Sequence, residues 1–242
     1  MPDTTATAPP AAPAPASPVT LGLRAALDAA ALYVVTAAED APDRLLAIVR
    51  AACEGGADIV QLRRKGDDVL ELTELAERCR AITAGFGALL IVDDRIDVAM
   101  AAGADGVHLG QEDLPLPAAQ RLRSAHDGGW PGVIGCSVHS LDQALDAEAA
   151  GADYLGVGPV FATPTKPGRP PIGLDVLGEV ASVVRLPWFA IGGVDGGTLP
   201  QVLAAGARAV AVVRAVTAAA DPSAAARGLR GVVLTHRRAA SP

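Results

Sequence analysis

Three polar side chains alternate within residues 61–65, directly after a short apolar run. They are Gln61, Arg63 and Lys65. Alternate residues of an extended strand point to the same side, which leaves Arg64 on the other side. Two cations and an amide on one face suit a polyanionic group such as a diphosphate. A solvated basic turn accounts for the same residues, since basic runs are common on protein surfaces, so the surrounding elements must decide.

Two carboxylates, Asp94 and Asp113, follow strands that we expect to be neighbours. Hard oxygen ligands without cysteine or patterned histidine favour Mg²⁺, which keeps several waters and bridges substrate phosphates. Each aspartate taken alone is also typical of a helix N-cap. Together with Arg63 and Lys65 on the adjacent strand, the two aspartates favour a site for a metal ion and a diphosphate.

A second anion site is indicated after the last two expected strands. Gly192-Gly193 leads into a helix, and Arg214 follows Val213 at the end of the last strand. Loops at these positions of a barrel commonly hold a phosphate on backbone N–H groups, and a glycine pair permits close approach. A plain turn that needs glycine for its backbone angles is the alternative. Two anion sites at one barrel mouth predict two phosphorylated substrates.

The segment after the sixth expected strand is long and carries Thr163, Thr165 and Lys166 before Pro167-Gly168. We interpret it as a lid that brings hydroxyls and a cation over the site. A disordered surface loop is the alternative.

Ser137 and His139 alternate at the end of the fifth expected strand and therefore face the same side. For His139, an acid–base role and a structural or solvent-facing role both stay open. His108 lies within the fourth expected strand, so we expect it in the barrel interior. No Ser-His-Asp or Cys-His arrangement in the sequence indicates covalent catalysis.

A phrase that begins Gly-Ala recurs four times and reveals the elements that must position these residues. It starts at Gly56, Gly103, Gly151 and Gly206, at intervals of 47, 48 and 55 residues. Each phrase follows a helical pattern and precedes a short apolar run, and its glycine fits the left-handed position that ends a helix. The intervals are too long for one βα unit and match two, so four phrases imply eight βα units.

The strands are expected as largely continuous apolar runs, as in a parallel sheet buried on both faces. They are Ala31–Thr36, Ile59–Leu62, Ala88–Asp93, Gly106–Leu109, Val133–Val138, Tyr154–Val157, Pro187–Ile191 and Ala209–Val213. Amphipathic helices are expected at Pro42–Glu54, Val69–Ala84, Ile96–Ala102, Pro117–Ala125, Leu141–Ala150, Leu174–Val184, Leu199–Ala205 and Ser223–Leu234.

This alternation predicts an α/β fold, a single (β/α)₈ TIM barrel. Residues suited to chemistry follow seven of the eight strands, as expected of a barrel enzyme. An open doubly wound sheet is the competing architecture, but residues 36–40 lack the glycine-rich turn expected after its first strand.

Composition narrows the class of protein further. Half of the 242 residues are hydrophobic and 3% are aromatic, so Ala and Val are expected to build the core. The net charge of −7 argues against general binding to nucleic acid or to an acidic membrane. Cys53, Cys79 and Cys136 lack CxxC spacing, so we expect reduced thiols in the cytoplasm. No apolar run approaches the roughly 18 residues of a membrane span.

Both ends of the chain are expected to lie outside the fold. Residues 1–19 are rich in Ala, Pro, Thr and Ser, which predicts a disordered tail rather than a signal peptide. We set the tail at residues 1–28 and the catalytic barrel domain at residues 29–236. Residues 237–242 are expected to fray.

Taken in order, six motifs resemble the thiamine phosphate synthase family over about residues 30–235. The motifs are Gln61–Lys65, Val92–Arg95, Gly110–Asp113, Ser137, Gly158–Phe161 with Thr163, Thr165 and Lys166, and Ile191–Gly193. The resemblance implies a transferase of thiamine biosynthesis. Such an enzyme joins 4-amino-5-hydroxymethyl-2-methylpyrimidine diphosphate to a thiazole phosphate and releases diphosphate.

The same resemblance implies a role for each site residue. Mg²⁺ would be held by Asp94 and Asp113. The pyrimidine diphosphate would be held by Gln61, Arg63, Lys65, Ser137 and Lys166, the last four of which would take part in catalysis. The thiazole phosphate would be held by Thr163, Thr165 and Gly193, with the backbone after strand 8 at Val213 and Arg214. Diphosphate would leave first, and the thiazole nitrogen would then attack a pyrimidine methylene cation, so no protein nucleophile is required.

Two positions depart from the family pattern. Asp93 stands where the family usually has Asn, and a carboxylate cannot donate as an amide does. Its contact with the pyrimidine or diphosphate is therefore in question, and the metal is an alternative partner. Arg214 stands where many relatives have Ser.

Two rival functions stay open at this point. A thiazole tautomerase of the same fold shares a run like Ser137–Ser140, with the histidine as acid–base catalyst, but has no use for a diphosphate and metal site. A non-catalytic protein that binds thiazole phosphate would not require Asp94 and Asp113. Carboxylation of the thiazole and the oligomeric state, including a homo-oligomer, also stay open.

Overall fold

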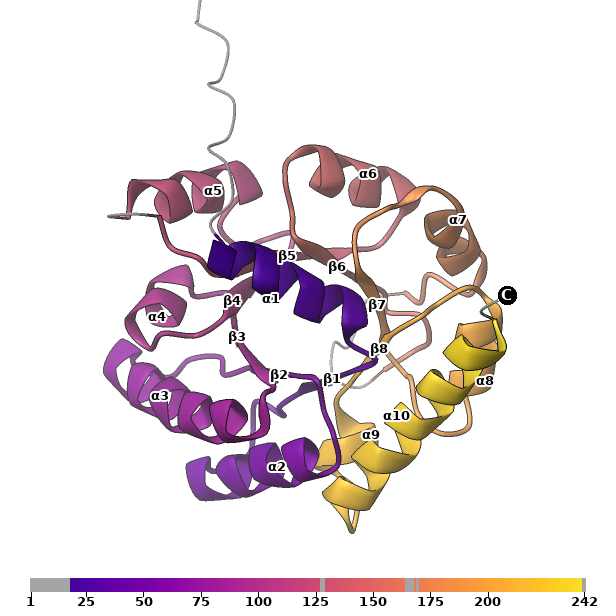
Figure 1. Cartoon of the computed structure of the whole chain (residues 1–242), viewed down its shortest axis with the longest axis horizontal. Coiled ribbons are helices and arrows are strands. Elements are labelled where there is room, and N and C mark those ends of the chain that lie inside the picture. Colours follow the sequence, from indigo (N-terminus) through magenta and orange to yellow (C-terminus); the bar gives the residue numbers. More distant parts are fainter. Residues whose placement is uncertain (1–17, 127–128, 164–167, 169, 241–242) are drawn as a thin grey trace, which may run out of the picture.

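The chain forms a closed barrel of eight parallel strands that follow one another in sequence order, as the spacing predicts (Figure 1). The computed structural model describes residues 18–126, 129–163, 168 and 170–240. The strands are β1 Leu32–Val35, β2 Ile59–Leu62, β3 Leu89–Asp93, β4 Gly106–Leu109, β5 Val133–Val138, β6 Tyr154–Val157, β7 Trp188–Ile191 and β8 Val210–Val212. Pairing of Leu32 with Val210 and of Tyr33 with Ala211 closes the barrel.

A ring of helices surrounds the strands (Figure 1). The described helices are α1 Pro18–Ala29, α2 Pro42–Glu54, α3 Val69–Phe86, α4 Ile96–Ala101, α5 Leu116–Ala125, α6 Leu141–Ala149, α7 Asp175–Val183, α8 Leu199–Ala204, α9 Arg214–Thr217 and α10 Pro222–Ala239. Eight of them match the expected helices to within a few residues at most ends, whereas α1 and α9 were not expected.

The strands are mostly apolar because both of their faces are buried, and their few polar residues, such as Gln61 and His108, point into the barrel. One hydrophobic cluster lies between strands and helices and includes Val34, Val60 and Leu90. The other includes Tyr33, Ile91 and other large side chains from alternate strand positions. Since successive residues of a strand point to opposite faces, this second cluster fills the barrel interior.

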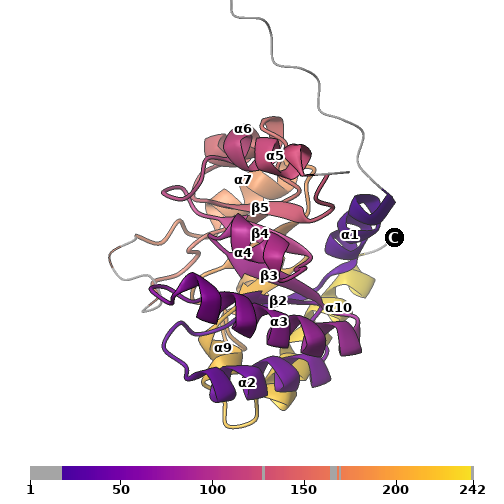
Figure 2. The same cartoon turned by 90° about the vertical axis from the view of Figure 1, so that its left-hand side faces the viewer.

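Helix α1 corrects the expected domain boundary, because residues 18–28 belong to the fold and not to a tail. Leu27 and Ala30 are buried in the interior cluster, and Thr20 Oγ1 donates to the carbonyl of Pro131 at 2.9 Å. Figures 1 and 2 show α1 lying across one end of the barrel. Those contacts come from residues far along the chain, which the composition of the tail could not indicate. The expected disorder of residues 1–17 lies outside the described residues.

Residues 237–239 are also part of the fold, which corrects the expected fraying from residue 237, whereas residues 241–242 lie outside the described residues. Helix α10 continues to Ala239, and the Arg237 guanidinium donates to the carbonyls of Ala29, Ala30 and Arg208. The helix therefore fastens the end of α1 to the start of β8. Within the described ranges, no helix has the length and apolar character needed to cross a membrane.

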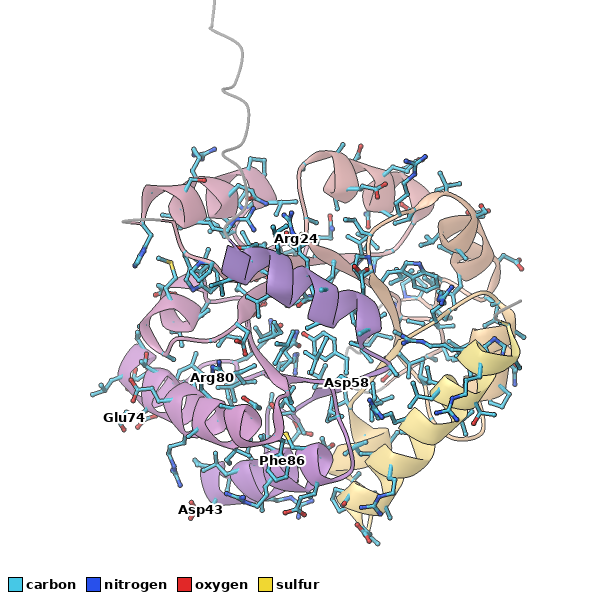
Figure 3. The ribbon with its side chains drawn as sticks, viewed as in Figure 1. Arg24, Asp43, Asp58, Glu74, Arg80 and Phe86 are labelled. Carbon is cyan, nitrogen blue, oxygen red and sulfur yellow. The ribbon has the colours of Figure 1, made fainter. Side chains whose placement is uncertain are left out.

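The aspartates of the repeated Gly-Ala-Asp phrase lie at the amino-terminal end of the barrel. Asp58, Asp105 and Asp153 each accept backbone N–H bonds from near the start of the preceding strand, at 2.8 to 3.0 Å. Each carboxylate is also paired with arginine, from Arg230, Arg80, and both Arg24 and Arg123, respectively. Figure 3 labels Arg24, Arg80 and Asp58. The repeat therefore ties pairs of strands together, away from the carboxyl ends.

Candidate functional site

A cavity of about 460 Å³ opens among the carboxyl ends of the strands. Val35, Asp93, Ile191 and Val212 line it, and each is the last residue of its strand. The cavity therefore lies at the end of a TIM barrel where catalytic residues are found. The expected site residues that line it are Gln61, Arg63, Asp93, Ser137, Thr163, Gly193, Val213 and Arg214.

Arg63 and Asp93 form an ion pair on one wall of the cavity. Arg63 Nε lies 3.5 Å from Asp93 Oδ2, and both side chains are largely buried. The Arg63 backbone is fixed by the neighbouring strand, because its N–H donates to Thr36 Oγ1 at 2.9 Å. The Asp93 carboxylate therefore offsets part of the positive charge that Arg63 brings to this wall.

A second charged group is formed by Lys65, Asp94 and Asp113. Its first two members follow Arg63 and Asp93 closely in the sequence. Lys65 Nζ lies 2.9 Å from Asp94 Oδ2, and the Asp94 carboxyl is hydrogen-bonded to that of Asp113. Asp113 Oδ2 also accepts the Gly110 N–H at 2.7 Å. Three of the expected residues are thus brought together from the ends of β2, β3 and β4.

Burial and the nearby carboxyl of Asp113 raise the pKa of Asp94, although Lys65 acts in the opposite direction. Asp94 also has a φ of 61°, the left-handed region, which no other described residue except glycine adopts. Asp tolerates this backbone better than most residues, and such strain often accompanies functional sites. Two close carboxylates on a strained backbone are an arrangement that a cation would stabilise.

Arg64 points away from both groups, as the alternation predicts. Its guanidinium pairs with Asp67 at 2.7 Å and donates to the carbonyls of Ala38 and Asp40. These contacts fasten the loop after β1 to the loop after β2. Arg64 is therefore structural, whereas its neighbours face the charged groups.

A buried chain of five polar side chains crosses the barrel beneath the cavity. Gln61 Nε2 donates to Tyr33 Oη at 2.8 Å, which lies 3.2 Å from Tyr154 Oη. Tyr154 Oη lies 3.1 Å from His108 Nδ1, and His108 Nε2 lies 2.9 Å from Ser137 Oγ. His108 is buried inside the barrel, as expected. The chain links two expected site residues, Gln61 and Ser137, through three that were not expected to take part.

Glycines in the strands make room for this chain. A Cβ added to Gly135 would lie 2.0 Å from Tyr154 Cζ, and one added to Gly156 would lie 3.2 Å from His108 Cε1. The glycines were readable in the sequence as gaps in two apolar strands, but their partners were not. Only closure of the barrel brings the tyrosines and the histidine across those gaps.

The opposite wall of the cavity is built from backbone around Gly192 and Gly193. Their φ angles are 96° and 68°, and a Cβ added to either would lie within 2.6 Å of Pro159 or Phe161. Both glycines are therefore required for the close approach of this turn to the segment after β6. Arg214, at the start of α9, is exposed and lines the same side of the cavity.

Thr163 and His139 come from the segments after β6 and β5. Both line the cavity, and His139 Nδ1 is hydrogen-bonded to the carbonyl of Gly158. Thr165 and Lys166, the other two expected residues of the lid, lie outside the described residues.

Comparison with known proteins identifies the family. The sequence pattern described as thiamine monophosphate synthase matches residues 32–216. A thiamine-phosphate synthase of Gloeobacter violaceus is 50% identical over 200 residues, which cover 83% of this chain and 56% of that protein. One from Mycobacterium sp. (strain KMS) is 46% identical over 225 residues, covering 87% of this chain and 96% of that protein. This chain thus spans little more than half the length of the Gloeobacter relative.

A solved structure supports the same assignment. Thiamine phosphate pyrophosphorylase from Pyrococcus furiosus superimposes with a TM-score of 0.77 and 38% identity, covering 87% of this chain and 98% of that one. The sequence pattern, the two relatives and this structure agree with each other and with the barrel and its cavity, and the chain therefore belongs to the thiamine monophosphate synthase family.

Proposed function

We propose that this chain joins a pyrimidine diphosphate to a thiazole phosphate, giving thiamine phosphate and diphosphate. The observation that carries the proposal is the pairing of two unlike walls in one cavity. One wall presents Gln61 and Arg63, with Ser137 reaching the cavity from β5 across the barrel, and the other presents the Gly192-Gly193 backbone and Arg214. A single cavity with an anion-binding group on each side suits two phosphorylated substrates held face to face.

The first wall would hold the pyrimidine diphosphate. Arg63 and Lys65 would bind the diphosphate oxygens and stabilise the charge that develops as diphosphate leaves. Ser137 would donate a hydrogen bond to the same substrate, and Lys166 would approach from the lid. Asp93 would offset part of the charge of Arg63 through the 3.5 Å ion pair.

Asp94 and Asp113 would hold Mg²⁺ beside the diphosphate. The donor set fits, since two hydrogen-bonded carboxyls, one with a raised pKa, form an oxygen site that a divalent cation would stabilise. No group of three or more His, Cys, Asp or Glu side chains gathers as a metal site in the described part of the chain, so water and substrate oxygens would complete the coordination. When bound, Mg²⁺ would neutralise charge on the leaving group.

The second wall would hold the thiazole phosphate. Thr163, Thr165 and Gly193 would donate to its oxygens, together with the backbone at Val213 and the cation of Arg214. The thiazole nitrogen would then face the pyrimidine methylene carbon from which diphosphate departs. The contribution of the protein is alignment and charge stabilisation, because no side chain has to form a covalent intermediate.

We further propose that the enzyme works in the cytoplasm. Cys53, Cys79 and Cys136 are free and buried, and burial raises their thiol pKa values to about 11, 12 and 11. Neutral buried thiols are slow to oxidise and suit a reducing compartment.

The decisive experiment is an assay of the purified protein with both substrates and Mg²⁺. We expect thiamine phosphate and one equivalent of diphosphate for each turnover. Arg63→Ala is expected to lower turnover at least tenfold, because it removes a charge-assisted contact to the leaving group. Failure to form product while a thiazole phosphate is still isomerised would favour the tautomerase function of His139 instead. Binding of thiazole phosphate without either reaction would favour a non-catalytic role.

A further inference from the structure

The hydrogen bonds from Gln61 to Ser137 have two self-consistent arrangements in which every hydroxyl and imidazole proton between these two residues is used within the series. Tyr33 and Tyr154 each carry one hydroxyl proton and can donate only once. Both stay protonated, since burial raises their pKa values well above the ordinary tyrosine value. A neutral imidazole donates from one ring nitrogen and accepts at the other. When each of these groups donates within the series, the direction of any one bond sets the direction of the rest.

In the first arrangement every proton points from Gln61 toward Ser137. Gln61 donates to Tyr33, Tyr33 to Tyr154, Tyr154 to His108 Nδ1, and His108 Nε2–H to Ser137 Oγ. The Ser137 hydroxyl proton is then left to point elsewhere, and Ser137 lines the cavity.

In the reversed arrangement every proton points the other way. Ser137 would donate to His108 Nε2, and the protons would run through His108 Nδ1–H and the two tyrosines to the Gln61 carbonyl oxygen. Ser137 could then only accept from a ligand. A diphosphate oxygen accepts hydrogen bonds and donates none, so this arrangement would set a lone pair against an anion.

The Gln61 amide distinguishes the two arrangements, because its nitrogen faces Tyr33 Oη at 2.8 Å. We propose that Tyr33, Tyr154 and His108 are positioning residues that hold the chain in the first arrangement. Tyr154 and His108 keep the Ser137 proton available to the anionic substrate, and Tyr33 leaves the Gln61 carbonyl oxygen as an acceptor. This inference rests on the proposed function for the identity of the anion, but the direction of the chain does not depend on it.

The barrel is shaped around this chain. Gly135 lies where any side chain would collide with the Tyr154 ring, and Gly156 gives His108 its space. Tyr33 and Tyr154 also pack edge to face on Phe189, with ring centroids 5.2 and 5.9 Å apart. The rings are therefore fixed by packing, so loss of one hydroxyl should leave the others in place.

The first test needs neither substrate nor activity. Nitrogen-15 NMR of the free protein reports which imidazole nitrogen carries the proton, and His108→Gln identifies the His108 signals. We expect the Nε2–H form in the unaltered protein and in Tyr33→Phe, where Tyr154 still donates to His108. In Tyr154→Phe the hydroxyl that donates to His108 Nδ1 is lost, and we expect a mixture of the Nε2–H and Nδ1–H forms. The Nδ1–H form or a doubly protonated ring in the unaltered protein, or an unchanged pattern in Tyr154→Phe, would overturn the proposal.

The second test is a double-mutant cycle on turnover. Tyr154→Phe is expected to lower kcat about tenfold, the loss of roughly one oriented hydrogen bond. In a Ser137→Ala background the same change should have almost no further effect, since Tyr154 acts through Ser137. For Tyr33→Phe we expect the opposite pattern. Its effect on kcat should almost vanish in a Gln61→Ala background and should add to that of Ser137→Ala. Full additivity of Tyr154→Phe with Ser137→Ala would show a merely structural role.

The two tests separate failure of this inference from failure of the proposed function. If the protein makes no thiamine phosphate but His108 responds to Tyr154→Phe as expected, the inferred direction of the hydrogen bonds is supported and the proposed function is wrong. If the unaltered protein makes thiamine phosphate but the tautomer of His108 does not respond to Tyr154→Phe, the proposed function is supported and this inference is wrong. Unfolding temperatures of both tyrosine variants control for loss of packing.

Discussion

Lys65 Nζ lies 2.9 Å from Asp94 Oδ2, yet the pKa of Asp94 is raised and not lowered. Burial and the carboxyl of Asp113 together outweigh the lysine, whose side chain is about half exposed. Water around an exposed lysine screens its charge, whereas the two carboxyls face each other in a more buried setting. The pKa of Asp94 is therefore governed by burial and by the neighbouring carboxyl of Asp113, and not by the positive charge of Lys65.

The raised pKa of Asp94 predicts a pH-dependent effect of Asp94→Asn on stability. Between the unfolded and folded pKa values the folded state binds more protons, so wild-type stability falls as pH rises through that interval. Asn cannot ionise and avoids this loss. Without metal, we expect Asp94→Asn to unfold about 2 °C higher near pH 7 and to match the wild type at low pH. Thermal scans in EDTA from pH 4 to 8 measure this.

Asp97→Asn is the matched control for that prediction. The hydrogen bond from Arg95 lowers the pKa of Asp97, so its contribution is present above the unfolded pKa and lost as pH falls. Asp97→Asn should therefore unfold at a lower temperature than the wild type near pH 7. The difference should be slight, because the pair of Arg95 and Asp97 is exposed. Equal signs for the two variants would contradict the account of Asp94.

Magnesium binding should appear as stabilisation that depends on the two carboxylates. At roughly ten times its Kd, Mg²⁺ should raise the unfolding temperature by about 3–6 °C, since it binds the folded state only. We expect Asp94→Asn and Asp113→Asn to lose this shift and Asp97→Asn to keep it. A full shift in both site variants would mean that the ion binds elsewhere.

The ion pair between Arg63 and Asp93 predicts that a substitution toward the family residue strengthens substrate binding. In Asp93→Asn the guanidinium is no longer partly neutralised, so the KM for the pyrimidine diphosphate should fall about threefold to tenfold, or ~1 kcal/mol. The KM for the thiazole phosphate should stay the same and serves as the internal control. An unchanged or higher KM for the diphosphate would show that Asp93 does not compete with the substrate for Arg63.

Much of this architecture was predictable because it is written in local patterns. The run Ile59–Leu62 is apolar apart from Gln61 and follows a left-handed glycine, and it forms β2 with the expected bounds. Three of the repeated Gly-Ala phrases carry aspartates that tie strands together, so the spacing reported real structural units. The order of the motifs after the strands then placed Arg63, Asp93 and Ser137 on one cavity.

The unpredicted parts depend on contacts between distant residues. Helix α1 is held by residues such as Asp153, 129 positions from Arg24, and the composition of the tail does not reveal that contact. Tyr33 and Tyr154 are 121 residues apart, and each reads as an ordinary apolar strand residue. Only barrel closure turns them into neighbours of Gln61 and His108. Local sequence therefore predicts the helices and strands. Which polar side chains meet inside the barrel can be seen only once the strands are assembled.

Asp153 predicts a stability effect remote from the site. Its side chain is fully buried, pairs with Arg24 and Arg123, and accepts the Ile134 N–H. In Asp153→Asn both cations lose their counter-charge, so we expect about 3 kcal/mol less stability in urea unfolding. Turnover of the folded fraction at low temperature should be normal. Asp43→Asn is the control, because Asp43 is almost fully exposed and its partner Arg78 is about half exposed, so this pair should matter little. Equal losses in the two variants would contradict this account.

Gly135 predicts that adding one methyl group disturbs both the fold and the buried hydrogen-bond chain. A Cβ at this position would lie 2.0 Å from Tyr154 Cζ, so the ring must move, which disturbs the hydrogen bond between Tyr154 Oη and His108 Nδ1. We expect Gly135→Ala to lose about 1–3 kcal/mol of stability, as overpacked cores do, and to lower kcat as Tyr154→Phe does. Gly178→Ala is the matched control. Gly178 is exposed in α7, where the nearest atom to a new Cβ lies 3.9 Å away, so that variant should gain about 0.5–1 kcal/mol with unchanged kcat. Normal turnover in Gly135→Ala would mean that the barrel can admit the methyl group without displacing Tyr154.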